Sequence, residues 1–399
     1  MRETVRRVGQ RFMIGFEGLE PSSDVKHLIR DFAVGHVILF ARNIEGPEQV
    51  AGLNRELQET ARDAGHDVPL LIAVDQEGGR VARMGPPWTV WPPLRALGRI
   101  ASESRADAET LARRMGAALA AECSSAGIKC DFAPIMDVDT NADNPIIGNR
   151  SFGDDPELVG RLGAAMVEGL QGGGVIASAK HFPGHGDTSV DSHLDLPVVE
   201  QGRTRLLDVE IRPFRQAVAA RVATIMMAHV LYPELDEELP ASLSTTIVDG
   251  ILRRDLGYDG VVFTDDLEMK AVADRWTPDR SAVLAMQAGC DIVPVCITHD
   301  AQVTAMEGAI RAVEAGDVAY KAMDDSLARI RAMKERYLLP HRDPLPKEAR
   351  ERAGSREFQA LAREISERGG EPLLFPWTSE LNGRPPVRPK PRRNPRGPE

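Results

Sequence analysis

Short apolar runs recur along the chain, and each is followed by polar residues and then by a longer amphipathic segment. The runs are continuous rather than alternating, which favours strands covered on both faces, as in a parallel sheet. We therefore predict eight strands, at Phe12–Phe16, Val37–Phe40, Leu70–Val74, Cys130–Met136, Val175–Ala179, Thr224–Ala228, Val261–Phe263 and Ile292–Val295.

The segments between these runs are predicted to be helices. Apolar residues fall at helical spacing in residues 47–64 and again in residues 103–126. Asp155-Pro156-Glu157 is typical of a helix start, and three glycines at 172–174 end that helix. Eight strands that alternate with helices predict a (β/α)8 barrel over residues 1–340. A doubly wound sheet is the alternative, but no GxGxxG motif follows an early strand.

The C-terminal part of the chain differs in composition. Residues 341–380 are expected to be a helical extension, in which the sequence LLFPW could dock on the barrel. Residues 381–399 carry five Arg, one Lys and six Pro with almost nothing to bury, which predicts a disordered tail.

Charge and composition exclude several classes of protein. The net charge of −11 argues against a nucleic-acid partner, and no apolar run is long enough to predict a membrane span. The first residues lack the apolar stretch of a signal peptide, so a cytoplasmic location is expected. The four cysteines form no CxxC pair, so we expect reduced core residues at Cys123, Cys130, Cys290 and Cys296.

Polar residues gather where five of the eight predicted strands end. This is the edge at which a (β/α)8 barrel carries its active site. The residues that follow strands three to seven are Asp75–Arg83; Asp137 and Asp139 with Asn149–Phe152; Lys180–His193; His229; and Thr264–Asp266. One such end could be a cap or a salt bridge, but five together indicate a functional site.

The segment after strand five contains the most residues with side chains that could take part in catalysis. Asp191 and His193 lie two apart, so in an extended segment their side chains point the same way. A carboxylate beside an imidazole fixes its tautomer and favours the protonated ring, as a proton donor requires. A histidine that only hydrogen-bonds the backbone is an equally good reading of His193 taken alone.

Asp265 and Asp266 are consecutive, so only one of them is expected to face the barrel mouth. The other is expected to cap a helix or join an ion pair. A carboxylate among cationic side chains stays ionised and can attack an electrophilic carbon. A nucleophilic carboxylate opposite a proton donor is the arrangement of a retaining glycosidase.

These residues resemble a known family. The segments KHFPGHGDTSVDSH (Lys180–His193), DQEGGRVAR (Asp75–Arg83), GNRSF (Gly148–Phe152) and FTDDLEM (Phe263–Met269) resemble glycoside hydrolase family 3. The similarity is greatest to its β-N-acetylhexosaminidase branch and covers roughly residues 10–335. The resemblance implies a cytoplasmic (β/α)8 barrel that needs no metal and no organic cofactor.

The matched motifs also imply roles. Asp265 matches the family's nucleophile, His193 its general acid/base and Asp191 the partner of that histidine. The sugar-binding positions match Asp75, Arg83, Arg150, Lys180 and His181. The expected activity is retaining removal of terminal β-linked N-acetylglucosamine from peptidoglycan-derived muropeptides. The expected partner is this small carbohydrate, bound by a monomer with no nucleic-acid or membrane partner.

Three alternatives stay open. The first is a metal-dependent hydrolase, in which zinc or manganese would be held by His181, His185, Asp187, Asp191 and His193. The second is a barrel that binds sugar without cleaving it. The third is another family 3 activity, either a β-glucosidase, a β-xylosidase or a phosphorylase. The carboxyl of Glu77 and the imidazole of His185 are alternative proton donors.

Several other polar residues are given structural roles. Glu77 and Arg80 are expected to stabilise their loop rather than touch sugar. His229 could brace the nucleophile, and Asp137 and Asp139 could line the site or cap a loop.

Overall fold

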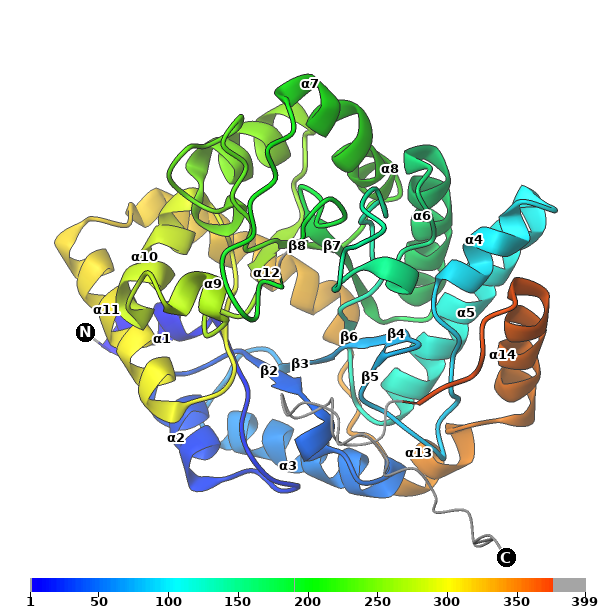
Figure 1. Cartoon of the computed structure of the whole chain (residues 1–399). Coiled ribbons are helices and arrows are strands. Elements are labelled where there is room, and N and C mark those ends of the chain that lie inside the picture. Colours follow the sequence, from blue (N-terminus) through cyan, green and yellow to red (C-terminus); the bar gives the residue numbers. More distant parts are fainter. Residues whose placement is uncertain (1, 190, 376–399) are drawn as a thin grey trace, which may run out of the picture.

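The computed structural model of the chain describes residues 2–189 and 191–375, and the predicted tail at 381–399 lies outside these residues (Figure 1). In the described part the strands are β1 (Phe12–Ile14), β2 (His36–Leu39), β3 (Leu71–Val74), β4 (Gln76–Gly78), β5 (Val81–Ala82), β6 (Cys130–Asp131), β7 (Ile176–Phe182), β8 (Thr224–Met227), β9 (Val261–Thr264) and β10 (Val293–Val295).

Helices follow most of the strands. The α-helices are α1 (Arg2–Gly9), α2 (Ser23–Asp31), α3 (Pro47–Asp63), α4 (Arg95–Ala101), α5 (Arg105–Ser125), α6 (Pro156–Gly172), α7 (Arg203–Arg205), α8 (Arg212–Ala219), α9 (Lys270–Ala273), α10 (Pro278–Ala288), α11 (His299–Ala315), α12 (Tyr320–Leu338), α13 (Pro346–Arg352) and α14 (Arg356–Gly369). The short 3₁₀ turns are η1 (Ala41–Asn43), η2 (Gly148–Arg150) and η4 (Ala241–Leu243), and the π-helical segments are η3 (Leu206–Glu210) and η5 (Thr246–Asp255).

Eight parallel strands of the described chain form one sheet in the order β10-β1-β2-β3-β6-β7-β8-β9. At the remaining seam, Phe263 and Ile292 form a parallel bridge, and the backbone N–H of Thr264 donates to the Ile292 carbonyl at 3.2 Å. The sheet therefore curls into a barrel, with helices around its outside (Figure 1). The predicted (β/α)8 barrel is confirmed, and an open doubly wound sheet is excluded.

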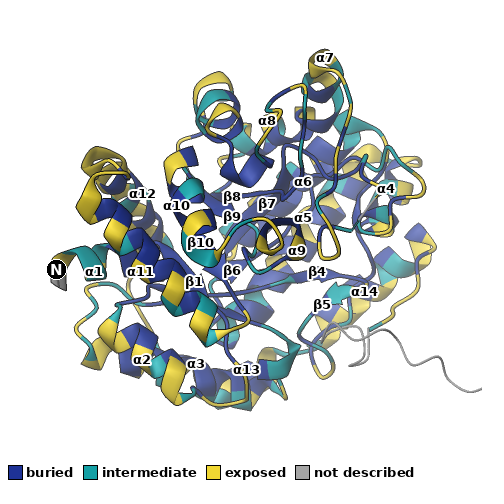
Figure 2. Cartoon of the chain, turned by 60° about the vertical axis from the view of Figure 1, so that its left-hand side comes forward, coloured by how far each residue is buried: buried dark blue, intermediate teal, exposed yellow. Residues whose placement is uncertain are grey.

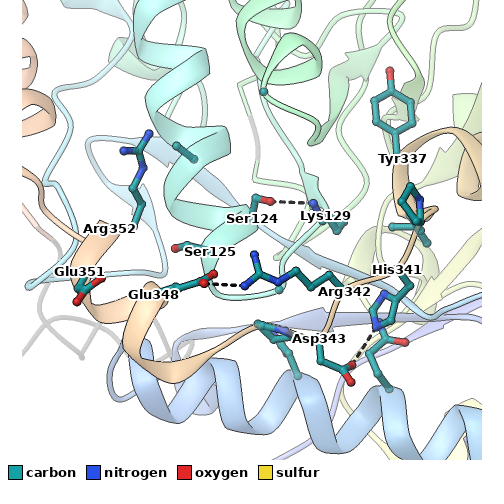
Figure 3. Close-up of a pocket in the computed structure, with 18 residues that line it drawn as sticks. Ser124, Ser125, Lys129, Tyr337, His341, Arg342, Asp343, Glu348, Glu351 and Arg352 are labelled. Carbon is teal, nitrogen blue, oxygen red and sulfur yellow. Dashed lines mark hydrogen bonds and ion pairs between the residues drawn. The ribbon is translucent and has the colours of Figure 1, made fainter.

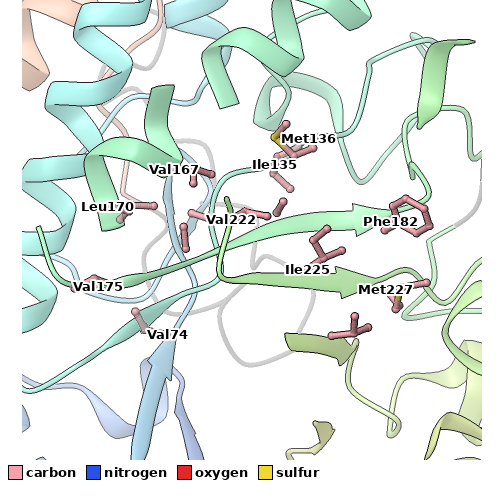
Figure 4. Close-up of a cluster of buried hydrophobic side chains, with 14 of the residues drawn as sticks. Val74, Ile135, Met136, Val167, Leu170, Val175, Phe182, Val222, Ile225 and Met227 are labelled. Atoms are coloured by element: carbon pink, nitrogen blue, oxygen red, sulfur yellow. The ribbon is translucent and has the colours of Figure 1, made fainter. Parts of the chain in front are cut away.

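Both faces of the strands are buried, which explains the continuous apolar runs. In β8, Ile225 and Met227 belong to the outer layer between sheet and helices, whereas Met226 belongs to the cluster inside the barrel. Figure 4 shows part of the outer layer, where β7 and β8 face the side chains of α6. In Figure 2 the strands are buried, while the surrounding helices expose one face.

The helix α12 covers one end of the barrel interior. Ile330, Met333 and Leu338 of this helix are buried in the same cluster as the inward-facing strand residues. The helix therefore closes the end of the barrel at which the strands begin. The polar residues lie at the opposite end, where the strands finish. No helix in the described part of the chain is long and apolar enough to cross a membrane.

Several sequence predictions about the strands need correction. The fourth strand was expected over Cys130–Met136, but β6 ends at Asp131, and Ile135 forms an isolated bridge with Lys180. Pro134 lies in this run and has no backbone N–H with which to continue the ladder.

The fifth strand was expected to end at Ala179, but β7 continues to Phe182. The predicted strand stopped at Ala179 because the prediction relied on continuous apolar residues, and Lys180 and His181 are polar. In the structure both side chains are buried through contacts with carboxylates. The antiparallel hairpin β4–β5 was not predicted, because its residues are polar and its strands are very short.

Other predictions hold. Asp155 accepts a hydrogen bond from the Glu157 N–H at 2.9 Å, as expected of the cap of α6. The four cysteines are buried and none of them forms a disulfide within the described residues. Beyond residue 340, the helices α13 and α14 occupy the segment expected to be helical.

The packing of α8 on the sheet gives a stability prediction. Phe214 of α8 and Phe182 of β7 are fully buried, with ring centroids 5.1 Å apart in an edge-to-face arrangement. Phe214→Ala should lower the free energy of unfolding by roughly 3–5 kcal/mol, because it leaves a cavity in a close-packed layer. Chemical denaturation measures this. The control Tyr320→Ala removes a half-exposed ring and should change stability by about 0.5 kcal/mol or less.

Candidate active site

The predicted site residues meet at the end of the barrel where the strands finish. Asp75 directly follows β3, and Asp265 directly follows β9. Lys180 and His181 are near the C-terminal end of strand β7. The backbone N–H of Asp265 donates to the carbonyl of Met227 at 3.1 Å, so hydrogen bonding to the end of β8 fixes its position.

A buried ion cluster lies on one side of this mouth. The Lys180 ammonium lies 2.8 Å from Asp75 Oδ1 and 2.7 Å from Glu77 Oε1. Arg150 donates to both oxygens of Glu77, at 2.9 and 2.7 Å, and the Glu77 side chain is only 1% exposed. Two cations thus share one carboxylate, and they come from different parts of the chain, Arg150 from η2 and Lys180 from β7.

Charge balance in this cluster decides its ionisation. Burial by itself favours the neutral form of Glu77, but the charges of Arg150 and Lys180 hold its pKa well below the usual range. Burial likewise opposes the charged form of Lys180, but Asp75 and Glu77 raise the pKa of that ammonium. Glu77 therefore stabilises its loop, as expected, and an ionised carboxylate held by two cations is a poor proton donor.

The hairpin β4–β5 brings Arg83 to the same cluster. Gln76 Oε1 accepts the backbone N–H groups of Arg83 and Met84 at 2.8 and 2.9 Å. This fixes the chain that carries the Arg83 guanidinium, which lies 3.6 Å from Asp75 Oδ2. Arg80, on the same hairpin, donates to the Pro145 carbonyl at 3.0 Å, so it ties this loop to the one before η2, as expected.

Asp137 holds the end of β7 in place. It is fully buried and accepts His181 Nδ1 at 2.8 Å, the His181 N–H at 3.1 Å and the His185 N–H at 2.7 Å. Although burial opposes ionisation, the neighbouring imidazoles lower the pKa of Asp137. Its carboxylate therefore orients the His181 ring rather than lining the site.

The tight turn after β7 depends on a glycine. A Cβ atom on Gly186 would lie 1.6 Å from the carbonyl oxygen of Val138, so no larger residue fits without moving the backbone. This close approach packs the loop against the segment after β6, and it explains one glycine of the motif that follows His181.

Asp265 and Asp266 have different environments. Burial raises the pKa of Asp265, but the nearby imidazoles of His181 and His193 and a hydrogen bond from the Asp266 N–H lower it. The net shift is downward. Burial raises the pKa of Asp266 to about 7, and its Oδ1 accepts the backbone N–H groups of Glu268 and Cys296 at 3.1 and 3.2 Å. Asp265 is therefore the ionised member of the pair, and Asp266 caps the following turn.

His229 lies beneath these two residues. Its Nε2 donates to the Asp266 carbonyl at 3.0 Å, and its Nδ1 lies 2.6 Å from Ser242 Oγ. Burial lowers the pKa of this imidazole, so it is neutral near pH 7. His229 thus braces the backbone of the Asp265 loop.

The pair Asp191–His193 lies on the exposed side of the mouth. Asp191 Oδ1 accepts both the His193 N–H and His193 Nδ1 at 2.8 Å, and 67% of the His193 side chain is exposed. The hydrogen bond that the His193 ring donates to Asp191 raises the pKa of His193, and the charge of Asp265 contributes in the same direction. His193 is therefore a carboxylate-oriented imidazole close to Asp265, and a purely backbone-bonded histidine is excluded.

His185 is a poor proton donor in this arrangement. It is buried, its Nδ1 lies 2.8 Å from Thr188 Oγ1, and its Nε2 lies 3.3 Å from Ser192 Oγ. Burial lowers its pKa to about 4, so the ring carries no spare proton near pH 7. Its contacts stabilise the loop that carries Asp191 and His193.

No group of three or more His, Cys, Asp or Glu in the described residues is arranged to hold a metal ion. Of the five residues considered for metal binding, His181 is turned to Asp137, His185 to Thr188, and His193 to Asp191. Asp187 accepts from Gln201 at 2.9 Å. The loop therefore does not converge these side chains on one point.

A cavity of about 600 Å³ lies at the opposite end of the barrel (Figure 3). It is lined by Lys129, which directly precedes β6, and by residues that connect α12 to α13. Its charged groups largely satisfy one another, since Arg342 pairs with Glu348 and His341 with Asp343. None of the predicted site residues lines it.

Sequence reasoning missed the part played by Asp137. The available signal was a carboxylate placed directly after a strand-like run, but the same signal fits a loop cap equally well. Only the contact with His181, 44 residues later in the chain, shows which is correct.

The chain is similar to known proteins over most of its length. The model of the glycosyl hydrolase family 3 N terminal domain matches residues 4–333. A beta-hexosaminidase of Thiobacillus denitrificans is 42% identical over 284 residues, which cover 71% of this chain and 77% of that protein. Among solved structures, a glycoside hydrolase family 3 beta-N-acetylglucosaminidase from Paenibacillus sp. str. FPU-7 superposes with a TM-score of 0.84 at 41% identity, covering 91% of this chain and 68% of that chain.

A smaller relative gives a similar result. NagZ from Neisseria gonorrhoeae, solved in complex with N-trifluoroacetyl-D-glucosamine, superposes with a TM-score of 0.74 at 32% identity. The match covers 90% of this chain and 98% of that chain.

The ion cluster predicts a strong dependence of stability on Glu77. Glu77→Gln should lower the free energy of unfolding by about 3–5 kcal/mol, because Lys180 and Arg150 would lose the carboxylate that they share in a buried site. Denaturant titration measures the change. Asp324→Asn is the matched control, since it removes an exposed partner of Arg7 and should have a small effect. Equal losses in the two variants would contradict the prediction.

The contact between Asp191 and His193 predicts a titration shift. Asp191→Asn should lower the pKa of His193, because the imidazolium loses its charged hydrogen-bond partner. In the unmodified protein the raised pKa keeps the ring protonated to higher pH than a free histidine. NMR titration of the ring protons measures both values, and an unchanged pKa would show that Asp191 does not control this group.

Proposed function

The chain belongs to glycosyl hydrolase family 3, and from this premise we propose that it is a retaining exo-β-N-acetylglucosaminidase. It would remove terminal β-linked N-acetylglucosamine from the non-reducing end of peptidoglycan-derived muropeptides. The observation that carries the proposal is an ionised Asp265 at the mouth of the barrel, coupled to a His193 that is oriented and charged by Asp191.

In the proposed mechanism, one sugar ring lies in the barrel mouth. Asp75, Arg83, Arg150, Lys180 and His181 bind its hydroxyl and acetamido groups. These side chains are already fixed by buried ion pairs and hydrogen bonds, so little side-chain freedom is lost when the sugar binds. No metal ion or organic cofactor takes part.

Cleavage of the glycosidic bond depends on an ionised Asp265 and a protonated His193. The carboxylate of Asp265 attacks the anomeric carbon, and the protonated imidazole of His193 transfers its proton to the departing oxygen. The products of this step are the free leaving group and a glycosyl ester of Asp265. Neutral His193 then takes a proton from water as the water attacks the ester, which restores both groups and retains the anomeric configuration.

A phosphorolytic version of the second step is the second candidate. The proton donor is a histidine, which is neutral after it has given its proton, whereas a carboxylate would be negative. The 67% exposure of His193 leaves it open to an acceptor from solvent. Phosphate could therefore replace water without charge repulsion from this group.

A substrate panel tests the proposal. The p-nitrophenyl β-glycosides of N-acetylglucosamine, glucose and xylose should be compared with and without phosphate. We expect the N-acetylglucosaminide to be cleaved far faster than the other two, with free N-acetylglucosamine as product. Preference for the glucoside or the xyloside would contradict the proposed substrate. A sugar phosphate product would indicate a phosphorylase. Binding without turnover would indicate a barrel that binds sugar without cleaving it. Activity that is lost with EDTA and restored by zinc would support a metal-dependent hydrolase.

The natural substrate and the cellular setting have their own tests. Muropeptides with a terminal N-acetylglucosamine should be cleaved with a higher kcat/KM than chitin fragments. A cytoplasmic location, which rests on the family resemblance, is checked by cell fractionation, and the predicted monomer by light scattering.

The proposed nucleophile gives a labelling prediction. A 5-fluoro N-acetylglucosaminyl fluoride should form a stable ester on the peptide that contains Asp265, because the fluorine slows breakdown of the intermediate. Asp265→Ala should lower turnover by several orders of magnitude while leaving the fold intact. Mass spectrometry of the digested protein identifies the labelled residue, and a label on Asp266 would contradict the assignment.

The proposed acid/base gives a leaving-group prediction. His193→Ala should slow release of a sugar leaving group more than release of p-nitrophenolate, which needs little protonation. With the activated substrate, the glycosyl-enzyme should accumulate and appear as a burst, because water attack would lack its base. Azide should rescue that second step. Equal losses for both leaving groups without rescue would place the proton donor elsewhere.

A further inference from the structure

A second cavity lies at the end of the barrel where the strands begin. Its volume is about 330 Å³, within the range of about 300–1,000 Å³ that is usual for small-molecule sites. It is lined by α1, by α12 and by the residues that lead from α3 into β3. It shares no lining residue with the cavity in Figure 3, and none of the predicted site residues lines it.

A buried lysine lines this cavity without a counter-charge. Lys334 of α12 is 0% exposed, and its ammonium donates to the Gly35 carbonyl at 3.2 Å and to Gln10 Oε1 at 3.4 Å. Both partners are neutral oxygens, and within the described chain Lys334 forms no ion pair with a carboxylate. Burial therefore lowers the pKa of Lys334 to about 7. Because a lysine is seldom fully buried unless it is paired, a bound anion would supply the missing partner.

Other cations surround this lysine. Arg6 and Arg7 of α1 and Arg331 of α12 line the same cavity, whereas its acidic lining residues in the described chain are Glu3 and Asp67. The basic side chains thus outnumber the acidic ones. An excess of positive charge around a cavity attracts anions.

His66 adds a hydrogen-bond acceptor to the lining. Its Nε2 lies 2.9 Å from the Ile29 carbonyl, which can only accept, so Nε2 carries the ring proton. Its Nδ1 is buried and has no hydrogen-bond partner among the residues that the structure describes. Burial, together with the charges of Lys334 and Arg6, lowers the pKa of this ring, so it is neutral near pH 7. Nδ1 is therefore an acceptor that lacks a donor.

The cations and the unfilled acceptor together select the chemistry of the ligand. Phosphate has oxygens that accept from Lys334 and the arginines, and near neutral pH it keeps a hydroxyl that can donate to His66 Nδ1. Sulfate has similar oxygens but no hydroxyl. The rest of the lining has room for an organic group, because it includes the apolar residues Ala33, Val68, Leu327 and Ile330.

We propose that this cavity is a binding site for a phosphate group, with Lys334 and Arg331 as its cationic contacts and with His66 Nδ1 as the acceptor of a ligand hydroxyl. The ligand is inorganic phosphate or a phosphorylated sugar, which share this chemistry. The site lies at the opposite end of the barrel from Asp265, so the proposal does not depend on the proposed function.

Isothermal titration calorimetry of the full chain tests the proposal with inorganic phosphate, glucose 6-phosphate and sulfate as probes. Lys334→Met and Arg331→Gln remove the two cations, and His66→Phe removes the acceptor. Lys321→Gln is the matched control, because it removes a positive charge from an exposed position of the same helix, about 20 Å away along the axis. Arg83→Ala removes a cation from the barrel mouth and tests whether phosphate binds there instead.

We expect Lys334→Met and Arg331→Gln each to weaken phosphate binding about tenfold, because each removes a charge-assisted hydrogen bond. Lys321→Gln and Arg83→Ala should leave it unchanged. The unmodified chain should bind phosphate more tightly than sulfate, and His66→Phe should bind the two alike. If glucose 6-phosphate binds more tightly than phosphate, the ligand is a phosphorylated sugar, and if it binds less tightly, the ligand is the inorganic ion.

Several results would overturn the proposal. One is the absence of binding by either phosphate probe. Another is binding that is weakened by Arg83→Ala but not by Arg331→Gln, which would place the phosphate at the barrel mouth. Equal weakening by Lys321→Gln and Arg331→Gln would show unspecific attraction to the charge of α12. Since Arg331 is exposed, Arg331→Gln provides the test even if Lys334→Met does not fold.

Discussion

The carboxylate of Glu77 is the contact on which the binding side of the site depends. It is almost completely buried and is shared by Arg150 and Lys180, which come from the loop after β6 and from β7. Each cation would be unfavourable in this environment without a counter-charge, and the carboxylate would be unfavourable without the cations. The cluster therefore fixes three separate parts of the chain relative to one another. Asp75 completes it, because it takes a second contact from Lys180 and faces Arg83.

The two sides of the mouth differ in burial and therefore in chemistry. On the side of Glu77, burial is offset by ion pairs, which lower the pKa of Glu77 and raise that of Lys180, so both stay charged near neutral pH. On the other side, His193 is largely exposed and, among the residues that the structure describes, its ring is hydrogen-bonded to Asp191, so its proton can exchange with solvent and with a ligand. Asp265 lies between them, and the surrounding imidazoles keep it ionised. This arrangement suits a reaction in which one sugar ring is held rigidly and a proton is transferred beside that ring.

The C-terminal region packs against the barrel from outside and contacts two loops near the mouth. The helix α14 packs on the outer layer through Phe358, Leu361 and Ile365, which are buried in the same core as α4 and α5. That packing fixes the point at which residues 371–375 begin, and Glu371 then ties them to Arg99 of α4. A segment that sequence reasoning treated as an appendage thus lies against two loops that carry sugar-binding candidates.

The sequence by itself determined the barrel, because strands buried on both faces must be continuously apolar and the helices between them carry readable caps such as Asp155. It also predicted where the candidate site residues gather, since His, Asp, Lys and Arg recur at the ends of several strands. The tertiary structure decided the end of β7, because Lys180 and His181 are buried by carboxylates that lie 105 and 44 residues earlier in the chain. It also decided which of Asp265 and Asp266 is ionised, because burial raises the pKa of Asp266, whereas imidazoles from other strand ends lower that of Asp265. The end of β7 and the ionisation of Asp265 both depend on burial and on groups that are distant in sequence. The local sequence pattern therefore could not predict either of them.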